Sequence, residues 1–116
     1  MMTMMTVDNN ASTANLNDLQ DLITAWAVDR GIHDHSTPTA QLLKAFSEMG
    51  EIADAEIKGD VEGQIDGVGD VVVCLINYAA MNGFTLAEAV AAAYNEIKDR
   101  KGRMVEGGAF VKEEDD

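Results

Sequence analysis

The chain has 116 residues, of which 47% are hydrophobic, and this is enough for one domain with a single core. Its 21 acidic and 8 basic residues give a net charge of −13, which opposes binding to nucleic acids and to anionic membranes. The lone cysteine, Cys74, cannot form an intramolecular disulfide, and no stretch approaches the roughly 18 uninterrupted apolar residues of a membrane span, so we expect a cytoplasmic protein.

The N-terminal part is expected to hold a leader and one helix. Residues 1–14 lack the basic flank and apolar core of a signal peptide, and we interpret them as a disordered leader. Helical spacing of apolar residues predicts a first helix over residues 16–30. Asn15 or Asn17 can cap its start, and Gly31 is its expected stop.

A loop and a second helix follow. Residues 32–37 are expected to form a loop. His33 and His35 are interpreted as surface residues of this loop, because a histidine metal site would need further ligands at fixed spacing. Thr37 followed by Pro38 is typical of a helix start. The second helix is therefore predicted from Pro38 to residue 58.

The third predicted helix runs from a cap at Asp60 to about residue 82, and residues 68–76 are apolar on nearly every side. A helix of that kind has to be buried all round, which a small monomer can hardly achieve. We therefore expect an oligomer interface there. Gly67 and Gly69 indicate close backbone approach, or room left for a bulky group.

The C-terminal part begins with Thr85 and Glu88, which form a capping-box pattern for a fourth helix reaching about residue 100. Residues 104–116 are expected to contain a turn and a brief extended segment, and residues 113–116 a frayed acidic tail.

Four carboxylate residues are the candidate metal ligands of this sequence. Glu48 and Glu51 lie three apart on the second predicted helix, and Asp66 and Asp70 lie four apart on the third, so each pair shares a helix face. If the two helices pack antiparallel, the pairs face each other and supply oxygen ligands suited to Mg²⁺ or Mn²⁺. The alternative is that these are solvated helix faces. Asp70 favours the metal, because an acid beside an apolar run needs a partner.

Three segments with these residues, 48–52, 65–71 and 93–103, resemble the MazG-like nucleoside triphosphate pyrophosphohydrolases, most of all the short phage-type members. The resemblance extends from about Trp26 to Lys112. It implies one catalytic domain over residues 15–112, with an all-α, four-helix bundle completed by oligomerisation as a homodimer or homotetramer. It also implies Mg²⁺-dependent hydrolysis of a nucleoside triphosphate to the monophosphate and pyrophosphate.

The resemblance also implies roles for particular residues. Two or three Mg²⁺ ions would be held by Glu48, Glu51, Asp66 and Asp70, and one of the two glutamates would accept the proton of the attacking water. The family usually has a glutamate at the position of Gly67, and here Asp66 is expected to replace it; the alternative is a site with three ligands, Glu48, Glu51 and Asp70. The substrate is expected to meet Trp26, Gln41, Lys44, Tyr94, Asn95, Lys98 and Lys101.

Several alternatives stay open at this point. Trp26 is either a core residue or a platform for the base, and the basic cluster at 98–103 is either a phosphate site or a solvated helix end. A purine such as dGTP or GTP is favoured as the base, with dUTP, dCTP or phosphoribosyl-ATP as alternatives. A different class is a non-enzymatic acidic protein that mimics DNA or blocks a host defence.

Overall fold

The computed structural model describes residues 14–113, so all but one residue of the expected leader (1–14) and of the expected tail (113–116) lie outside the described residues. The described residues form helices α1 (Leu16–Asp29), α2 (Ile32–His35), α3 (Pro38–Lys58), α4 (Val61–Met81) and α5 (Leu86–Ile97), followed by strands β1 (Gly102–Met104) and β2 (Phe110–Lys112). The mostly helical fold that the sequence predicts is confirmed.

Local capping sets the helix starts. Oδ1 of Asn15 accepts a hydrogen bond from the N–H of Asp18, and Oγ1 of Thr37 accepts one from Ala40. The prediction of a loop over residues 32–37 was wrong for its first part, because α2 forms one short helical turn there. Gly31, at φ +82°, reverses the chain between α1 and α2.

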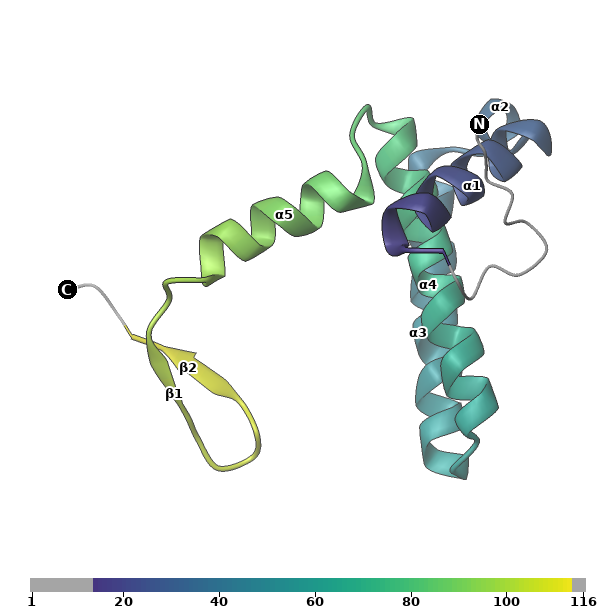
Figure 1. Cartoon of the computed structure of the whole chain (residues 1–116). Helices are drawn as coiled ribbons and strands as arrows, with labels where there is room; N and C mark the ends of the chain where they lie inside the picture. Colours follow the sequence, from purple (N-terminus) through teal and green to yellow (C-terminus); the bar gives the residue numbers. More distant parts are fainter. Residues whose placement is uncertain (1–13, 114–116) are drawn as a thin grey trace.

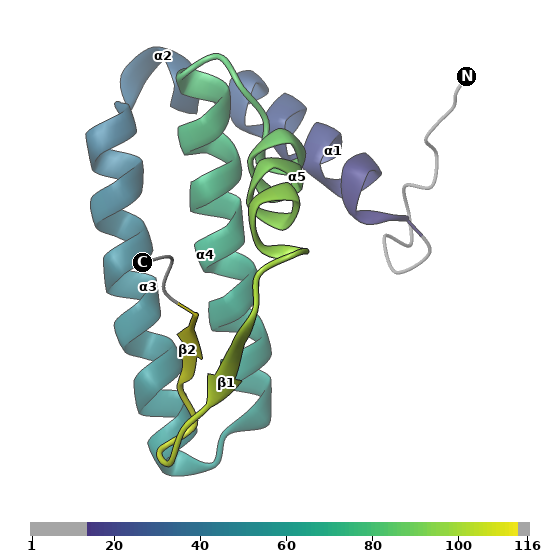
Figure 2. The ribbon, with the colours of Figure 1, turned by 90° about the vertical axis from the view of Figure 1, so that its left-hand side faces the viewer.

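The long helices α3 and α4 lie side by side as a helical hairpin (Figures 1 and 2). Gly59 ends α3 in the left-handed conformation at φ +70°, and Oδ1 of Asp60 caps α4 by accepting from the N–H of Gly63. The antiparallel packing that the sequence analysis assumed is thus present.

Two of the glycines of α4, Gly67 and Gly69, differ in what surrounds them. A Cβ built on Gly67 would lie 2.5 Å from Cγ1 of Ile52, so glycine allows α4 to approach α3 closely. A Cβ on Gly69 would meet nothing within 4 Å. Close approach is therefore the reason for Gly67 but not for Gly69 within one chain.

The core within one chain is small. Its fully buried apolar residues are mostly alanines, joined by Cys74 and Ile76, and the largest fully buried side chain is the polar Asn77. Many large apolar side chains on α3, α4 and α5 remain exposed. The single chain therefore leaves much of its apolar surface uncovered.

The arm, as we call residues 86–112 with α5, β1 and β2, extends away from the helical hairpin (Figure 1). The axis turns by 98° between α4 and α5. In β1 and β2, Arg103 pairs with Val111, and the turn contains Gly107 and Gly108 at positive φ. The radius of gyration is 17.2 Å, against about 13–14 Å for a compact chain of this length.

No single helix in the described range is long and apolar enough to cross a membrane; α4 and α5 together have the length and composition for it, but as a pair bent by 98°.

Candidate active site

A cavity of about 460 Å³ opens where the ends of α1 and α2 meet the middle of α3 and α4. We call it the Glu48 cavity. Five residues that the sequence analysis assigned to the site line it: Trp26, Gln41, Lys44, Glu48 and Asp70. The other lining residues are Ile32, Ser36, Val73, Cys74 and Asn77. Residues from four helices, up to 51 positions apart in the chain, thus converge on one space.

Glu48 is the most constrained carboxylate of the cavity. Its side chain is only 13% exposed, and Nζ of Lys44 lies 3.9 Å from its Oε2, one helical turn away. Burial raises the pKa of Glu48 above its ordinary 4.5, and the negative charges of Glu51 and Asp70 raise it further. The positive charge of Lys44 lowers the pKa of Glu48. The negative charge of Asp66 raises it, by less than the other causes do. An acidic group held among other acids is the electrostatic pattern of a cation site.

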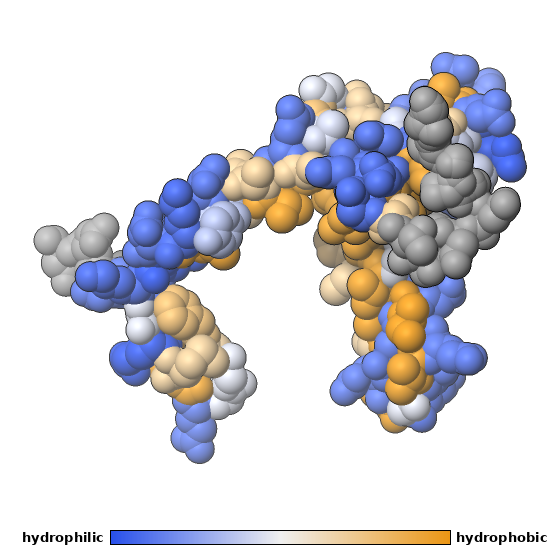
Figure 3. All heavy atoms as spheres, in the orientation of Figure 1, coloured by the Kyte–Doolittle hydropathy of each residue, from blue (hydrophilic) through white to orange (hydrophobic). Residues whose placement is uncertain are grey.

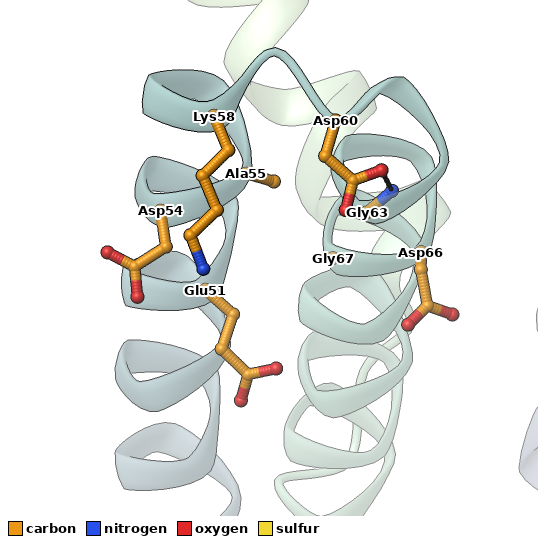
Figure 4. Close-up of a pocket in the computed structure, with 8 residues that line it drawn as sticks. All are labelled: Glu51, Asp54, Ala55, Lys58, Asp60, Gly63, Asp66 and Gly67. Carbon is orange, nitrogen blue, oxygen red and sulfur yellow. Dashed lines mark hydrogen bonds between the residues drawn. The ribbon is translucent and has the colours of Figure 1, made fainter.

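The other two predicted metal ligands lie in a second space. Glu51 and Asp66 line a groove of about 260 Å³ toward the α3–α4 turn, which we call the Glu51 groove. Figure 4 shows the Glu51 carboxylate directed into the space between the helices, whereas that of Asp66 is directed away from α3 in this view. Lys58 and Asp60 also line this groove. The four carboxylates are therefore split into two pairs along the hairpin.

The donor set suits a hard divalent cation, since all four candidate ligands are carboxylates and Glu48 is crowded by the other three. Among residues 14–113, however, no three His, Cys, Asp or Glu side chains already lie close enough together to hold one ion. The carboxylates would have to converge by rotation of their side chains. Glu48 and Asp70, which line the same cavity, need the least rearrangement.

The cavity wall contains a buried polar side chain, Asn77, that the sequence analysis missed. Asn77 is 1% exposed; its Oδ1 lies 3.0 Å from Nε2 of His33, and its Nδ2 donates to the carbonyl of Val73. A signal for Asn77, though not for its partner, was available in the sequence, because this polar residue directly follows the apolar run of residues 68–76. His33 was assigned to a surface loop, but it is partly buried and joined to α4.

Trp26 and Gln41 border the same cavity. Trp26 is 47% exposed, so it is not a core residue within one chain, and the guanidinium of Arg30 lies 5.5 Å from its ring centroid. Nε2 of Gln41 donates to Oγ of Ser36 at 3.0 Å, which holds the start of α3 against the end of α2. An exposed aromatic face at the rim of a cavity is suited to stacking on a planar ligand.

The substrate-binding residues predicted in the C-terminal part line neither the Glu48 cavity nor the Glu51 groove. Tyr94, Asn95, Lys98 and Lys101 are exposed on the arm. The helix was predicted to reach residue 100 but ends at Ile97, so Lys101 does not share a helical face with Asn95 and Lys98. Within one chain, these residues and the carboxylates belong to separate parts of the structure (Figure 1).

One comparison gives a relative. Over 68 residues the chain is 35% identical to an uncharacterised 18.2 kDa protein of the rep–hol intergenic region of Haemophilus phage HP1 (strain HP1c1). The match covers 56% of this chain and 42% of the phage protein, so the chain spans less than half the length of that relative. No family profile and no solved structure matches the chain.

Proposed function

We propose that the protein hydrolyses a nucleoside or deoxynucleoside triphosphate to the monophosphate and pyrophosphate, with Mg²⁺ or Mn²⁺ as cofactor. The observation that carries this proposal is the Glu48 cavity, where a nearly buried carboxylate, a second carboxylate, a lysine and a half-exposed tryptophan line one space. The resemblance of segments 48–52, 65–71 and 93–103 to MazG-like enzymes supports the same reaction.

Different residues of the cavity would contact different parts of the substrate. The ring of Trp26 offers a stacking face for the base. Lys44 offers positive charge to the phosphates, and its 3.9 Å contact with Glu48 is loose enough to be exchanged for a phosphate oxygen. The base would then lie toward α1 and the phosphates toward the acidic middle of α3 and α4.

Glu48 is the residue best suited to accept the proton of water. Its carboxylate is nearly shielded from solvent and lines the same cavity as Lys44 and Asp70, so it is placed beside the space that the substrate and the attacking water would occupy. In the proposed step, water oxygen bonds to the α phosphorus, the bond from that phosphorus to the bridging oxygen breaks, and pyrophosphate leaves. The water proton goes to the Glu48 carboxylate.

A divalent cation, held by Glu48 and Asp70 with Glu51 and Asp66 as further ligands, would neutralise the triphosphate and lower the pKa of attacking water. Because the acidic helical hairpin would otherwise repel a polyanion, catalysis should depend strictly on such ions.

The test is a panel of all NTPs and dNTPs with Mg²⁺, scored for monophosphate and pyrophosphate, with dGTP and GTP first. Glu48→Gln should be inactive, and Glu56→Gln, an exposed position on the same helix, is the matched control. Absence of products from every substrate, with a melting temperature that millimolar Mg²⁺ does not change, would sink the proposal. That result would favour a non-enzymatic acidic binding protein.

A further inference from the structure

The surface of the helical hairpin does not by itself favour a nucleotide. Figure 3 shows hydrophilic residues on both sides of an apolar stripe along the lower part of the hairpin, and residues 38–81 contain eight acidic and two basic residues. A surface of this charge repels a polyanion. Because the phosphates are also common to all nucleotides, selection among them has to come from the uncharged base.

The Glu48 cavity is built on two levels of the hairpin. On α3, Gln41 lies seven residues farther from the α3–α4 turn than Glu48, and on α4, Asn77 lies seven residues farther from it than Asp70. All four residues line the cavity. Seven residues make about two helical turns, so each amide shares a helix face with a carboxylate that lies about 10 Å away along the axis. The cavity therefore has an acidic level and an amide level.

The spacing of the two levels suits a nucleoside. The distance of about 10 Å is close to the reach of a purine nucleotide from the outer edge of its base to its α phosphate. When the phosphates lie at the acidic level, as the proposed function has them, the outer edge of the base arrives at the amide level. Trp26 lines the same cavity, and its half-exposed ring is available to stack on the base.

Asn77 offers the amide level a hydrogen-bond donor of fixed direction. Its side chain is 1% exposed, its Oδ1 lies 3.0 Å from Nε2 of His33, and its Nδ2 donates to the carbonyl of Val73 at 3.2 Å. An amide nitrogen carries two hydrogens, and among residues 14–113 the second one has no acceptor. Turning the amide over would set Oδ1 against the Val73 carbonyl and lose that bond. Asn77 is therefore held as a donor.

Gln41 supplies the matching acceptor. Its Nε2 donates to Oγ of Ser36 at 3.0 Å, and its Oε1 has no donor within the described residues. The amide level thus combines a donor on α4 with an acceptor on α3. The complementary ligand edge has a carbonyl oxygen next to a ring N–H, which is the lactam edge of guanine, hypoxanthine, uracil and thymine. Adenine and cytosine carry an amino group next to a ring nitrogen, so two donors would meet at Asn77.

We propose that the amide level recognises the lactam edge of a base, so that the protein takes nucleotides of guanine, hypoxanthine, uracil or thymine and rejects those of adenine and cytosine. Asn77 donates to the carbonyl oxygen, and Gln41 accepts from the neighbouring ring N–H. The rejection comes mainly from Asn77, because Gln41 is held by one hydrogen bond and can turn. The inference rests on the proposed function for the place of the phosphates, but the base can be tested without them.

Inosine and adenosine test the amide level without phosphate, metal or hydrolysis, because their bases differ only in the lactam edge. Trp26 is the single tryptophan of the chain, so its fluorescence reports stacking at the cavity. We expect inosine to bind with a dissociation constant at least about ten-fold below that of adenosine. Equal constants, tighter binding of adenosine, or no response to millimolar inosine would each overturn the inference.

A matched pair of variants tests Gln41. Gln41→Met should reduce the preference for inosine several-fold, since methionine is of similar length but has no comparable acceptor. The control is Gln64→Met, a half-buried position on α4 that lines neither the Glu48 cavity nor the Glu51 groove, and it should keep the preference. Asn77 stays intact in this test, because replacing so buried a side chain endangers the fold. A preference unchanged in Gln41→Met would contradict the assigned acceptor.

Hydrolysis separates this inference from the proposed function. When hydrolysis occurs, kcat/KM for dITP should exceed that for dATP by about ten-fold or more. Hydrolysis with equal values would overturn the recognition of the lactam edge and leave the proposed function intact. Selective binding of inosine by a protein that hydrolyses no nucleotide would support the recognition and remove the proposed function.

Discussion

Nε2 of His33 and Oδ1 of Asn77 are hydrogen-bonded at 3.0 Å, which joins the short α2 to the middle of the C-terminal half of α4 behind the Glu48 cavity. Since Nδ2 of Asn77 donates to Val73, its Oδ1 is the acceptor and His33 donates from Nε2. The amide is 1% exposed, so in the intact chain its oxygen depends on the histidine for a donor.

His33→Ala should therefore destabilise the fold by about 1–3 kcal/mol, because it leaves a buried amide oxygen without a donor. Urea unfolding measures this. The control is His35→Ala, an exposed residue of the same helical turn, which should cost well under 1 kcal/mol. Adding Asn77→Leu to His33→Ala should cost less than the sum of the two single changes; simple additivity would show that the bond carries no stability.

Gly67 and Gly69 make a matched pair on α4. Gly67→Ala should cost about 1–3 kcal/mol, since the added Cβ would press on Ile52 and force the helices apart. Gly69→Ala meets nothing within the chain and should stabilise the helix by about 0.5–1 kcal/mol. Chemical unfolding of both variants checks the pair. Equal effects would contradict the close packing of α4 on α3 at Gly67.

Glu48→Gln should raise the melting temperature at neutral pH when no divalent ion is present. The folded-state pKa of Glu48 is raised, so the stability that comes with its protonated form is lost as the pH rises through that pKa. Glutamine removes the repulsion permanently, and its advantage should shrink below pH 4 or so, where Glu48 is protonated in both states. A melting curve that is lower for Glu48→Gln throughout would show that its contact with Lys44 outweighs the repulsion.

Asp70→Asn should reduce turnover by about 100-fold or more while the chain stays folded, because a neutral amide is a poor ligand for a hard cation. Asp66→Ala should weaken metal binding as well, if Asp66 replaces the usual acid. Calorimetric titration with Mn²⁺ separates the two positions. Unchanged affinity in Asp66→Ala would leave Glu48, Glu51 and Asp70 as the metal site.

The structure also predicts that glutamate at position 67, where the resembled family usually has its acid, will not rescue Asp66→Ala. That position faces Ile52 of α3, and even a Cβ would have to displace it.

Much of the secondary structure was determined by the sequence itself, because its causes are local. Thr37 with Pro38, Asp60, and the Thr85–Glu88 capping box each satisfy backbone N–H groups within one turn, and the structure places helix starts at these points. The placement of the pair Glu48 and Glu51 across from the pair Asp66 and Asp70 was also expected from the sequence. A short turn between two long helices leaves them little choice but antiparallel packing, which fixes the register of residues at equal distances from the turn.

Only the tertiary structure decided which way each side chain points. Glu48 and Asp70 share a cavity while Glu51 and Asp66 share a groove, because the contact of Gly67 with Ile52 fixes the rotation of α4 against α3. The hydrogen bond between His33 and Asn77 joins residues 44 positions apart, so no local sequence pattern could predict it. The direction of the arm is likewise set by a distant residue, Gln20, through its hydrogen bond to Ala87. Helical periodicity places residues around an axis, but the packing of one helix on another determines what each of them meets.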